Sequence, residues 1–205
     1  MLEISFEDDF LLVVNKPAGV LSQPGKTMDG SIATQVAHAY PDATGPLLVH
    51  RLDMDTSGLL LLAKRRDIHR QLQQLFEKRR VAKRYIALLT SKPIGLGGLV
   101  TLPIRSDIDN RPSQIVCHEH GKAAATLWRL MPEGASFTRV LFQPVTGRTH
   151  QLRVHSAAAQ GLNSPIVGDR LYGAAAERLM LHAQCLEFEH PITKAMLRIT
   201  AEAPF

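Results

Sequence analysis

The stretch HRLDMDTSGLLLLA, from His50 to Ala63, joins a polar segment directly to a run of apolar residues. The apolar run, Leu59 to Ala63, predicts a short strand that is buried on both faces. The three residues before it, Thr56 to Gly58, are types that are common where a chain turns into a strand. Asp53 is then either a turn residue that accepts backbone hydrogen bonds or the carboxylate of a site, and the stretch alone favours the turn.

On both sides of this strand, the sequence predicts further short strands and about three helices. The predicted strands are FLLVVNKPAGV (residues 10–20, ended by Pro17), VAKRYIALL (81–89), 122–131 and 137–142 around a PEGAS turn, 180–188 and 196–201. The predicted helices run from an N-cap at Ser31 to Tyr40, from an N-cap at Asp67 to Phe76, and onward from a cap at Thr149. SKPIGLGGLV (91–100) and RSDIDNRPSQ (105–114) are predicted to be connecting loops.

Strands therefore predominate and do not alternate regularly with helices. This pattern predicts an α+β fold with a mixed, mainly antiparallel β-sheet core and flanking helices. No internal repeat and no linker rich in Pro, Gly or Ser divides the chain, so residues 1–205 are expected to form a single domain.

Composition limits the kind of protein. The chain has 205 residues, of which 45% are hydrophobic, and its longest apolar runs are too short to cross a membrane. The first ten residues, MLEISFEDDF, lack the basic segment of a signal peptide. Cys117 and Cys185 lie far apart and in no metal-binding spacing. We expect a cytoplasmic protein that does not associate with membranes.

Positive charge is concentrated in one segment. Lys64 to Arg84 contains nine basic residues against Asp67 and Glu77, a net charge of +7, whereas the whole chain carries +5. A local basic patch on a near-neutral body is typical of proteins that bind polyanions. The alternative is a solvated basic helix face without a partner, and charge alone does not decide between them.

A second candidate site is GRTHQLRVH, from Gly147 to His155. Arg153 is predicted to lie on a helix, from which it could form a bidentate pair with a carboxylate. His150 and His155 are five residues apart, a poor spacing for a helical metal site, so no metal is expected. The chain lacks GxGxxG, P-loop, GxSxG and CxxC motifs, so an ATP or dinucleotide enzyme is disfavoured and no cofactor is expected.

Together, the motifs resemble those of the RluA family of pseudouridine synthases. HRLDMDTSG matches the family signature HRLDxxTSG, and VVNKPAGV, KRYIALL, GRTHQLRVH and PIVGDRLYG followed by LMLHA resemble its other motifs in family order. The resemblance covers about residues 10 to 190. It implies the pseudouridine synthase catalytic fold, without an S4-type RNA-binding domain, and an isomerase that reattaches uracil to ribose through carbon without a cofactor.

The resemblance also implies roles for individual residues. Asp53 matches the catalytic aspartate, which attacks C6 of uracil or assists cleavage at C1′, and sequence does not choose between these routes. Arg153 matches the arginine that pairs with this aspartate, and Tyr85 matches the active-site tyrosine, so the implied catalytic residues are Asp53, Tyr85 and Arg153. The implied substrate contacts are Arg51, which fills the space left by the flipped base, together with His50, Arg148 and Leu181.

The segment LPIRSDIDNRPSQIVCHEHGKAAAT resembles a loop of the enzyme that gives the family its name, which acts on a uridine in tRNA anticodon loops and on one in 23S rRNA. The expected partner is therefore RNA, a tRNA anticodon stem-loop, 23S rRNA or both, bound by a monomer. The sequence departs from the family pattern at Leu162 to Ser164, where the loop before Asp169 is lengthened. Two alternatives stay open: an RNA-binding or ribosome-assembly factor without catalysis, and an RNA N-glycosidase that releases uracil.

Overall fold

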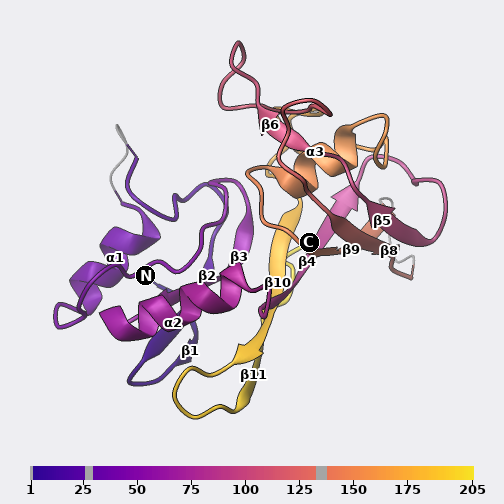
Figure 1. The fold of residues 1–205 in the computed structure, drawn as a ribbon. Helices are drawn as coiled ribbons and strands as arrows, with labels where there is room; N and C mark the ends of the chain where they lie inside the picture. The colour runs from indigo at the N-terminus through magenta and orange to yellow at the C-terminus, as the bar shows by residue number, and fades with distance from the viewer. Residues whose placement is uncertain (1, 26–29, 133–137) are drawn as a thin grey trace. The chain divides into compact units, whose positions relative to one another are not determined.

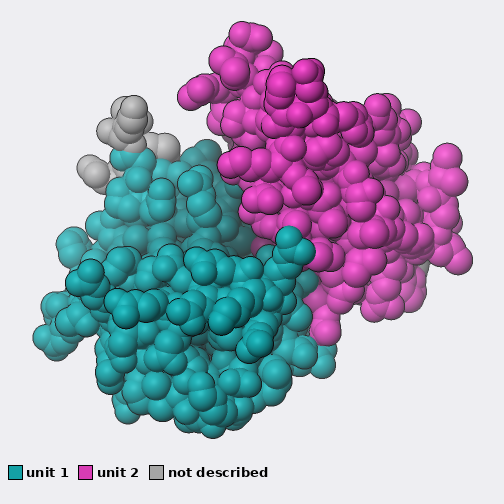
Figure 2. All heavy atoms as spheres, viewed as in Figure 1, with its two compact units in different colours: residues 1–83, 182–204 teal, residues 84–181, 205 magenta. Residues whose placement is uncertain are grey.

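The computed structural model describes residues 2–25, 30–132 and 138–205. Figure 2 shows the chain as two compact units: unit 1 contains residues 1–83 and 182–204, and unit 2 contains residues 84–181 and Phe205. Unit 1 is thus built from two segments distant in sequence, whereas unit 2 is almost continuous. That residues 1–205 form a single domain stays a prediction.

Unit 1 contains a mixed β-sheet whose strands can be followed in Figure 1. The strands are β1 (Ile4–Glu7), β2 (Leu11–Lys16), β3 (Ser57–Ala63), β10 (Leu181–Glu189, from His182 in this unit) and β11 (Met196–Thr200). Their order is β1-β2-β3-β10, and β11 pairs with β10. β3 and β10 are parallel, and the other pairs are antiparallel. All seven residues of β3 are buried, which confirms the strand predicted from the leucine run.

Helix α2 (Arg66–Glu77) packs against one face of this sheet (Figure 1). Its residues Ile68 and Leu72 lie in one apolar cluster with Leu59 and Leu61 of β3, as their helical spacing predicted. The predicted N-cap was wrong, because the helix begins after Arg65 and Asp67 lies in its first turn. The Asp67 carboxylate is instead bound by the Arg65 guanidinium at 2.8 and 3.0 Å.

Helix α1 (Ile32–Ala39) begins as predicted. Ser31 is its N-cap, and the Ser31 hydroxyl accepts a hydrogen bond from the backbone N–H of Thr34 at 3.2 Å. Ile32 and Val36, four residues apart, are both buried. The prediction of an amphipathic helix at this position is confirmed.

Gly58 makes the parallel pairing of β3 with β10 possible. Its φ is +112°, and a Cβ built on it would lie under 3.0 Å from three backbone atoms of Ala183. Ala183 is its register partner on β10. A side chain at this position would force the two strands apart, so the last residue of the TSG motif is required by packing.

Replacing Gly58 by alanine should therefore destabilise unit 1 by about 3 kcal/mol or more, since the backbone of Ala183 cannot move without disturbing the sheet. The matched control is Gly19→Ala, because Gly19 also has a positive φ (+81°) but has nothing within 4 Å of a built Cβ. We expect Gly19→Ala to cost about 1 kcal/mol, from backbone strain alone. Urea unfolding measures both, and equal losses would show that the close approach to Ala183 is not the constraint.

Unit 2 contains an antiparallel sheet in the order β4-β9-β8-β5. Its strands are β4 (Ala82–Leu89, from Arg84 in this unit), β9 (Thr138–Pro144), β8 (Thr126–Leu130) and β5 (Gly97–Val100). β6 (Ile104–Ser106) and β7 (Gln114–Val116) form a separate hairpin. The predicted loops at 91–100 and 105–114 therefore each contain strand residues. Residues 133–137 lie outside the described residues; they include four of the five residues of the predicted PEGAS turn and the first residue of the strand predicted at 137–142.

Helix α3 (Gln151–Ala157) belongs to unit 2, and its residues 151–156 are all buried. The predicted cap at Thr149 was wrong, because the N-cap is His150, in the left-handed conformation with φ 53°. The Gln151 side chain closes the preceding turn instead: its carbonyl oxygen accepts from Arg148 N–H at 3.0 Å and from the Thr146 hydroxyl at 2.7 Å. The strands and helices of both units confirm the predicted α+β fold with a mixed, mainly antiparallel core.

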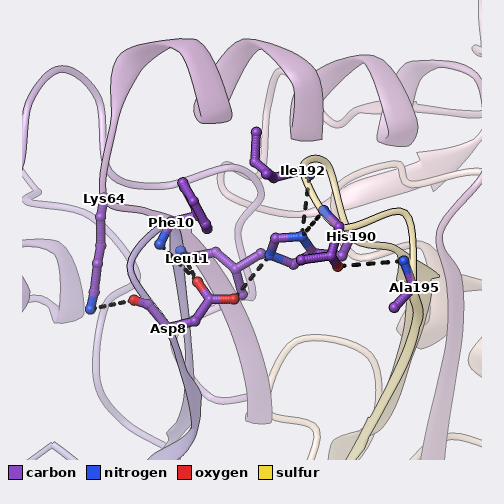
Figure 3. A network of polar contacts seen from close by, with 8 residues as sticks. Asp8, Phe10, Leu11, Lys64, His190, Ile192 and Ala195 are labelled. Carbon is purple, nitrogen blue, oxygen red and sulfur yellow. Dashed lines mark hydrogen bonds and ion pairs between the residues drawn. The ribbon is translucent and has the colours of Figure 1, made fainter.

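A buried histidine joins the two sequence segments of unit 1 (Figure 3). His190 Nδ1 accepts from the backbone N–H groups of Ile192 and Thr193 at 3.2 and 3.0 Å, so the ring proton of the neutral imidazole is on Nε2. Nε2 donates to Asp8 Oδ2 at 2.9 Å. The other oxygen of Asp8 accepts from the N–H groups of Phe10 and Leu11. The β1–β2 turn and the β10–β11 turn are thereby held together.

Candidate active site

The backbone on either side of Asp53 is fixed by hydrogen bonds within unit 1. Before it, the Ser22 hydroxyl accepts from Leu52 N–H at 3.0 Å and donates to Leu52 C=O at 2.7 Å. After it, the carbonyl of Met54 accepts from Gly19 N–H at 2.9 Å. Because both neighbours are held, the Cα of Asp53 has a defined position, which is the first requirement for a catalytic side chain.

Lys16 completes this support. Its side chain is fully buried, and its ammonium group donates to the carbonyl oxygens of Pro17, Val20 and Met54 at 2.9, 2.7 and 2.9 Å. Burial of a cation is costly unless its protons are bonded, and these carbonyl groups engage all three. This role of Lys16 was not predicted from the sequence. A lysine at the end of a buried strand, in VVNKPAGV, was the signal that could have revealed it.

Asp53 and Arg51 differ in exposure. Asp53 is half-buried, and its carbonyl accepts from Thr56 N–H at 3.2 Å, which closes a turn in front of β3. Arg51 is exposed. The stretch is thus a turn before a strand, as its local pattern favoured, and it leaves Arg51 exposed and both Asp53 and Asp55 half-buried.

His50, predicted to contact substrate, has a structural environment in unit 1. Its Nε2 accepts from the backbone N–H of Leu61 at 3.0 Å, and its ring stacks on Phe76 with centroids 4.7 Å apart. Burial, and secondarily the positive charge of Lys83, lower the pKa of His50 to about 3. The imidazole is therefore neutral near pH 7, and a contact with RNA phosphate through a charged ring is disfavoured.

This low pKa predicts a pH dependence of stability. The His50 pKa in the folded protein lies below the value of about 6.5 in the unfolded chain, so protons bind preferentially to the unfolded state. The stabilisation is complete above about pH 6.5 and is lost as the pH falls toward 3, by at most about 1.4 kcal/mol per pH unit. In His50→Gln the decline in unfolding free energy between pH 7 and pH 4 should be shallower than in the wild type. The control is His118→Gln at an exposed position, and identical slopes for wild type and His50→Gln would contradict the prediction.

Arg153 is held in unit 2 by the buried carboxylate of Asp169. Its Nε donates to Asp169 Oδ2 at 2.8 Å and its terminal nitrogen to Asp169 Oδ1 at 2.7 Å, a bidentate pair with both side chains buried. Gly168, with φ +79° and no space for a Cβ beside Arg178, sets the turn that directs Asp169. The helical placement of Arg153 is confirmed, and its pairing with Asp53 stays a prediction.

The other predicted site residues of unit 2 lie in two settings. Tyr85 on β4 is half-buried and packs against the apolar cluster that contains Ala87 and Leu89. Leu181 belongs to the same cluster. Arg148 is exposed, and its Nε donates to the carbonyl of Ala123 at 3.1 Å. Tyr85 and Leu181 thus share one cluster.

The lengthened loop before Asp169 is anchored rather than loose. Leu162 is buried in the apolar cluster of unit 2. The Ser164 hydroxyl donates to the carbonyl of Ser91 at 2.8 Å and accepts from Ser91 N–H at 3.0 Å. These contacts attach the extra residues to the segment after β4 and so define the path of the chain toward Asp169.

Within residues 2–25, 30–132 and 138–205, no three His, Cys, Asp or Glu side chains are grouped so that they could hold a metal ion. None of the helices described is long and apolar enough to cross a membrane.

The chain resembles known proteins over its whole length. Residues 10–158 match the family described as RNA pseudouridylate synthase. The dual-specificity RNA pseudouridine synthase RluA of Escherichia coli (strain K12) is 42% identical over 212 aligned positions, which cover 100% of this chain and 94% of that protein. The protein of the same name from Haemophilus ducreyi (strain 35000HP / ATCC 700724) is 40% identical, with the same coverage.

Solved structures agree with these relatives. Human RNA Pseudouridylate Synthase Domain Containing 1 is 30% identical with a TM-score of 0.82, covering 100% of this chain and 84% of that one. Human RNA Pseudouridylate Synthase Domain Containing 4 is 26% identical with a TM-score of 0.79, covering 98% of this chain and 88% of that one.

Proposed function

The chain belongs to the RNA pseudouridylate synthase family and isomerises uridine to pseudouridine in RNA, and we propose that its targets are a tRNA anticodon stem-loop, 23S rRNA or both. The resemblance of residues 102–126 to the loop of the dual-specificity enzyme supports these targets. The relatives at 40–42% identity carry the description dual-specificity. We further propose a cytoplasmic monomer in which residues 1–205 act as one catalytic domain.

In this proposal Asp53 is the catalytic carboxylate. The observation that carries it is the fixed backbone around Asp53, where Ser22 holds Leu52, and Lys16 and Gly19 hold Met54, in a motif that matches the family signature. The bond between C1′ and N1 breaks, a bond between C1′ and C5 forms, the proton on C5 is lost, and N1 gains a proton. An ionised carboxylate serves either route to this product, by attack at C6 or by assistance at C1′.

Other residues support the reacting groups. Tyr85 provides an aromatic ring and a hydroxyl for the uracil, and Leu181 provides apolar contact. Arg153 matches the arginine that pairs with this aspartate in the family, and it orients the Asp53 carboxylate. Arg51 is exposed and has a planar guanidinium, which suits it to stack in the space that a flipped uridine leaves. Arg148 contacts phosphate, and His50 supports the loop that carries Asp53.

Incubation of the protein with RNA that carries tritium at C5 of uracil tests the activity. The wild type should release tritium from a tRNA anticodon stem-loop or a 23S rRNA fragment, and Asp53→Asn should reduce release to background, because an amide can neither attack nor deprotonate. Mass spectrometry of the RNA should show unchanged mass. Release by Asp53→Asn equal to that of the wild type would reject Asp53 as the catalytic residue, and loss of uracil mass would indicate the N-glycosidase.

We also propose that helix α2 and its C-terminal flank bind the RNA backbone. Lys64 is paired with Glu7 at 2.7 Å, and Arg65 is paired with Asp67, so part of the basic segment is neutralised internally. Five other basic side chains are exposed, and no ion pair among the described residues neutralises them: Arg66, Arg70, Lys78, Arg79 and Arg80. Arg66 and Arg70 are four residues apart and so lie on one helix face.

This surface predicts a salt dependence that can be assigned to residues. Each phosphate contact contributes about 0.7 to 0.9 to the slope of log affinity against log salt concentration. Arg66→Gln combined with Arg70→Gln should therefore reduce the slope for RNA binding by up to about 2. The control, Arg65→Gln, removes a charge already paired with Asp67 and should change the slope less. Equal slopes for the double variant and the wild type would exclude this face from the interface.

A further inference from the structure

Tyr172 lies three residues after Asp169 and is half-buried in unit 2. It packs against an apolar cluster formed by Ile104 of β6, Ala124 and Val154 of α3. No role was predicted for Tyr172 from the sequence, although it is the tyrosine of PIVGDRLYG. Tyr172 thus lies between helix α3 and the β6–β7 hairpin.

The hydroxyl of Tyr172 connects these two elements. It accepts a hydrogen bond from the backbone N–H of Gln114, the first residue of β7, at 2.7 Å. It also lies 2.7 Å from Nδ1 of His150, the N-cap of α3. A phenol has one proton and two lone pairs, so it can accept from Gln114 and still hydrogen-bond to His150. One oxygen atom thereby holds the β6–β7 hairpin to the start of the helix that carries Arg153.

The rest of Tyr172 contacts the arginine and its partner. The guanidinium of Arg153 lies over the Tyr172 ring, with its central carbon 5.2 Å from the ring centroid. The backbone N–H of Tyr172 donates to Asp169 Oδ1 at 3.2 Å, the oxygen that also accepts from the terminal nitrogen of Arg153. Asp169 thus fixes the guanidinium along its edge, and Tyr172 supports its face and helps to fix Asp169.

We propose that Tyr172 is a positioning residue, which sets the orientation of the Arg153 guanidinium for the reaction and ties it to the β6–β7 hairpin. The proposal rests on the proposed function, since it gives Arg153 a part in catalysis. A displacement of about 1 Å in a catalytic group can cost on the order of 100-fold in rate. The Tyr172 ring contacts the Arg153 guanidinium directly, so it contributes more to the orientation of this group than the hydroxyl does. The hydroxyl acts indirectly, by holding the helix, the hairpin and the ring in fixed positions relative to one another.

Substitutions can separate the ring from the hydroxyl. Tyr172→Phe keeps the face against Arg153 and loses the links to Gln114 and His150, so tritium release should slow about 10-fold in kcat with little change in KM. Tyr172→Leu loses both and should slow about 100-fold or more. Tyr40→Phe is the matched control, because Tyr40 lies in unit 1 and its hydroxyl is hydrogen-bonded to Glu7. It should leave kcat unchanged.

A double-mutant cycle tests the link itself. His150→Asn is suitable because asparagine tolerates the left-handed conformation of this N-cap. If the hydroxyl acts through His150, the double variant with Tyr172→Phe should be no slower than the slower single variant. Wild-type kcat in Tyr172→Phe, a change in KM alone, or multiplied rate losses in the double variant would overturn the proposal.

A spectroscopic measurement separates this proposal from the proposed function. The NMR resonance of the Arg153 Nε–H reports its hydrogen bond to Asp169 without any turnover. It should shift or broaden in Tyr172→Phe and stay unchanged in Tyr40→Phe. An unchanged resonance in Tyr172→Phe would overturn the positioning role even if the enzyme is active. Absence of tritium release by the wild type would instead reject the proposed function, and the resonance would still show whether Tyr172 orients Arg153.

Discussion

Gly58 lies directly against the backbone of Ala183, and this approach without a side chain lets β3 pair in parallel with β10. The rest of unit 1 depends on the pairing. β3 is buried along its whole length and joins β2 to β10, and α2 packs on the face that β3 helps to form. The same motif ends in Gly58 and begins with the residues proposed to meet RNA. The site and the centre of the sheet are therefore parts of one short segment.

Regular apolar patterns predicted most of the fold, because burial of one face repeats along a strand or helix. The leucine run, the helix from Ile68 to Phe76 and the two C-terminal strands are present. The helix starts at Asp67 and Thr149 were wrong, because a cap depends on competing partners. Asp67 is bound by Arg65, and the Gln151 side chain closes the turn before α3. The β6–β7 hairpin was missed because three-residue strands leave almost no periodic signal.

The site was predictable where a motif is continuous and hidden where a partner is distant. HRLDMDTSG pointed to Asp53, and GRTHQLRVH placed Arg153 on a helix. The support for these residues comes from elsewhere in the chain: Lys16 contacts Met54 across 38 residues, and Asp169 binds Arg153 across 16. Local sequence gives each such residue an ordinary explanation, a strand end or a tight turn. Only the folded chain distinguishes these explanations from a supporting role.

The hydrogen bond from His190 to Asp8, like the pairing of β3 with β10, joins the first segment of unit 1 to its last. This has a consequence for the order in which the chain can fold during synthesis. Unit 2 is almost continuous in sequence, so its strands are all available once residue 181 has left the ribosome. Unit 1 lacks β10 and β11 until residues 182–204 follow, and the edge of β3 that pairs with β10 has no partner before then. Contacts across such long separations form slowly. The sheet of unit 1 therefore stays incomplete until its last strands have been synthesised. During that interval its unpaired strand edge and apolar surface can bind chaperones or aggregate.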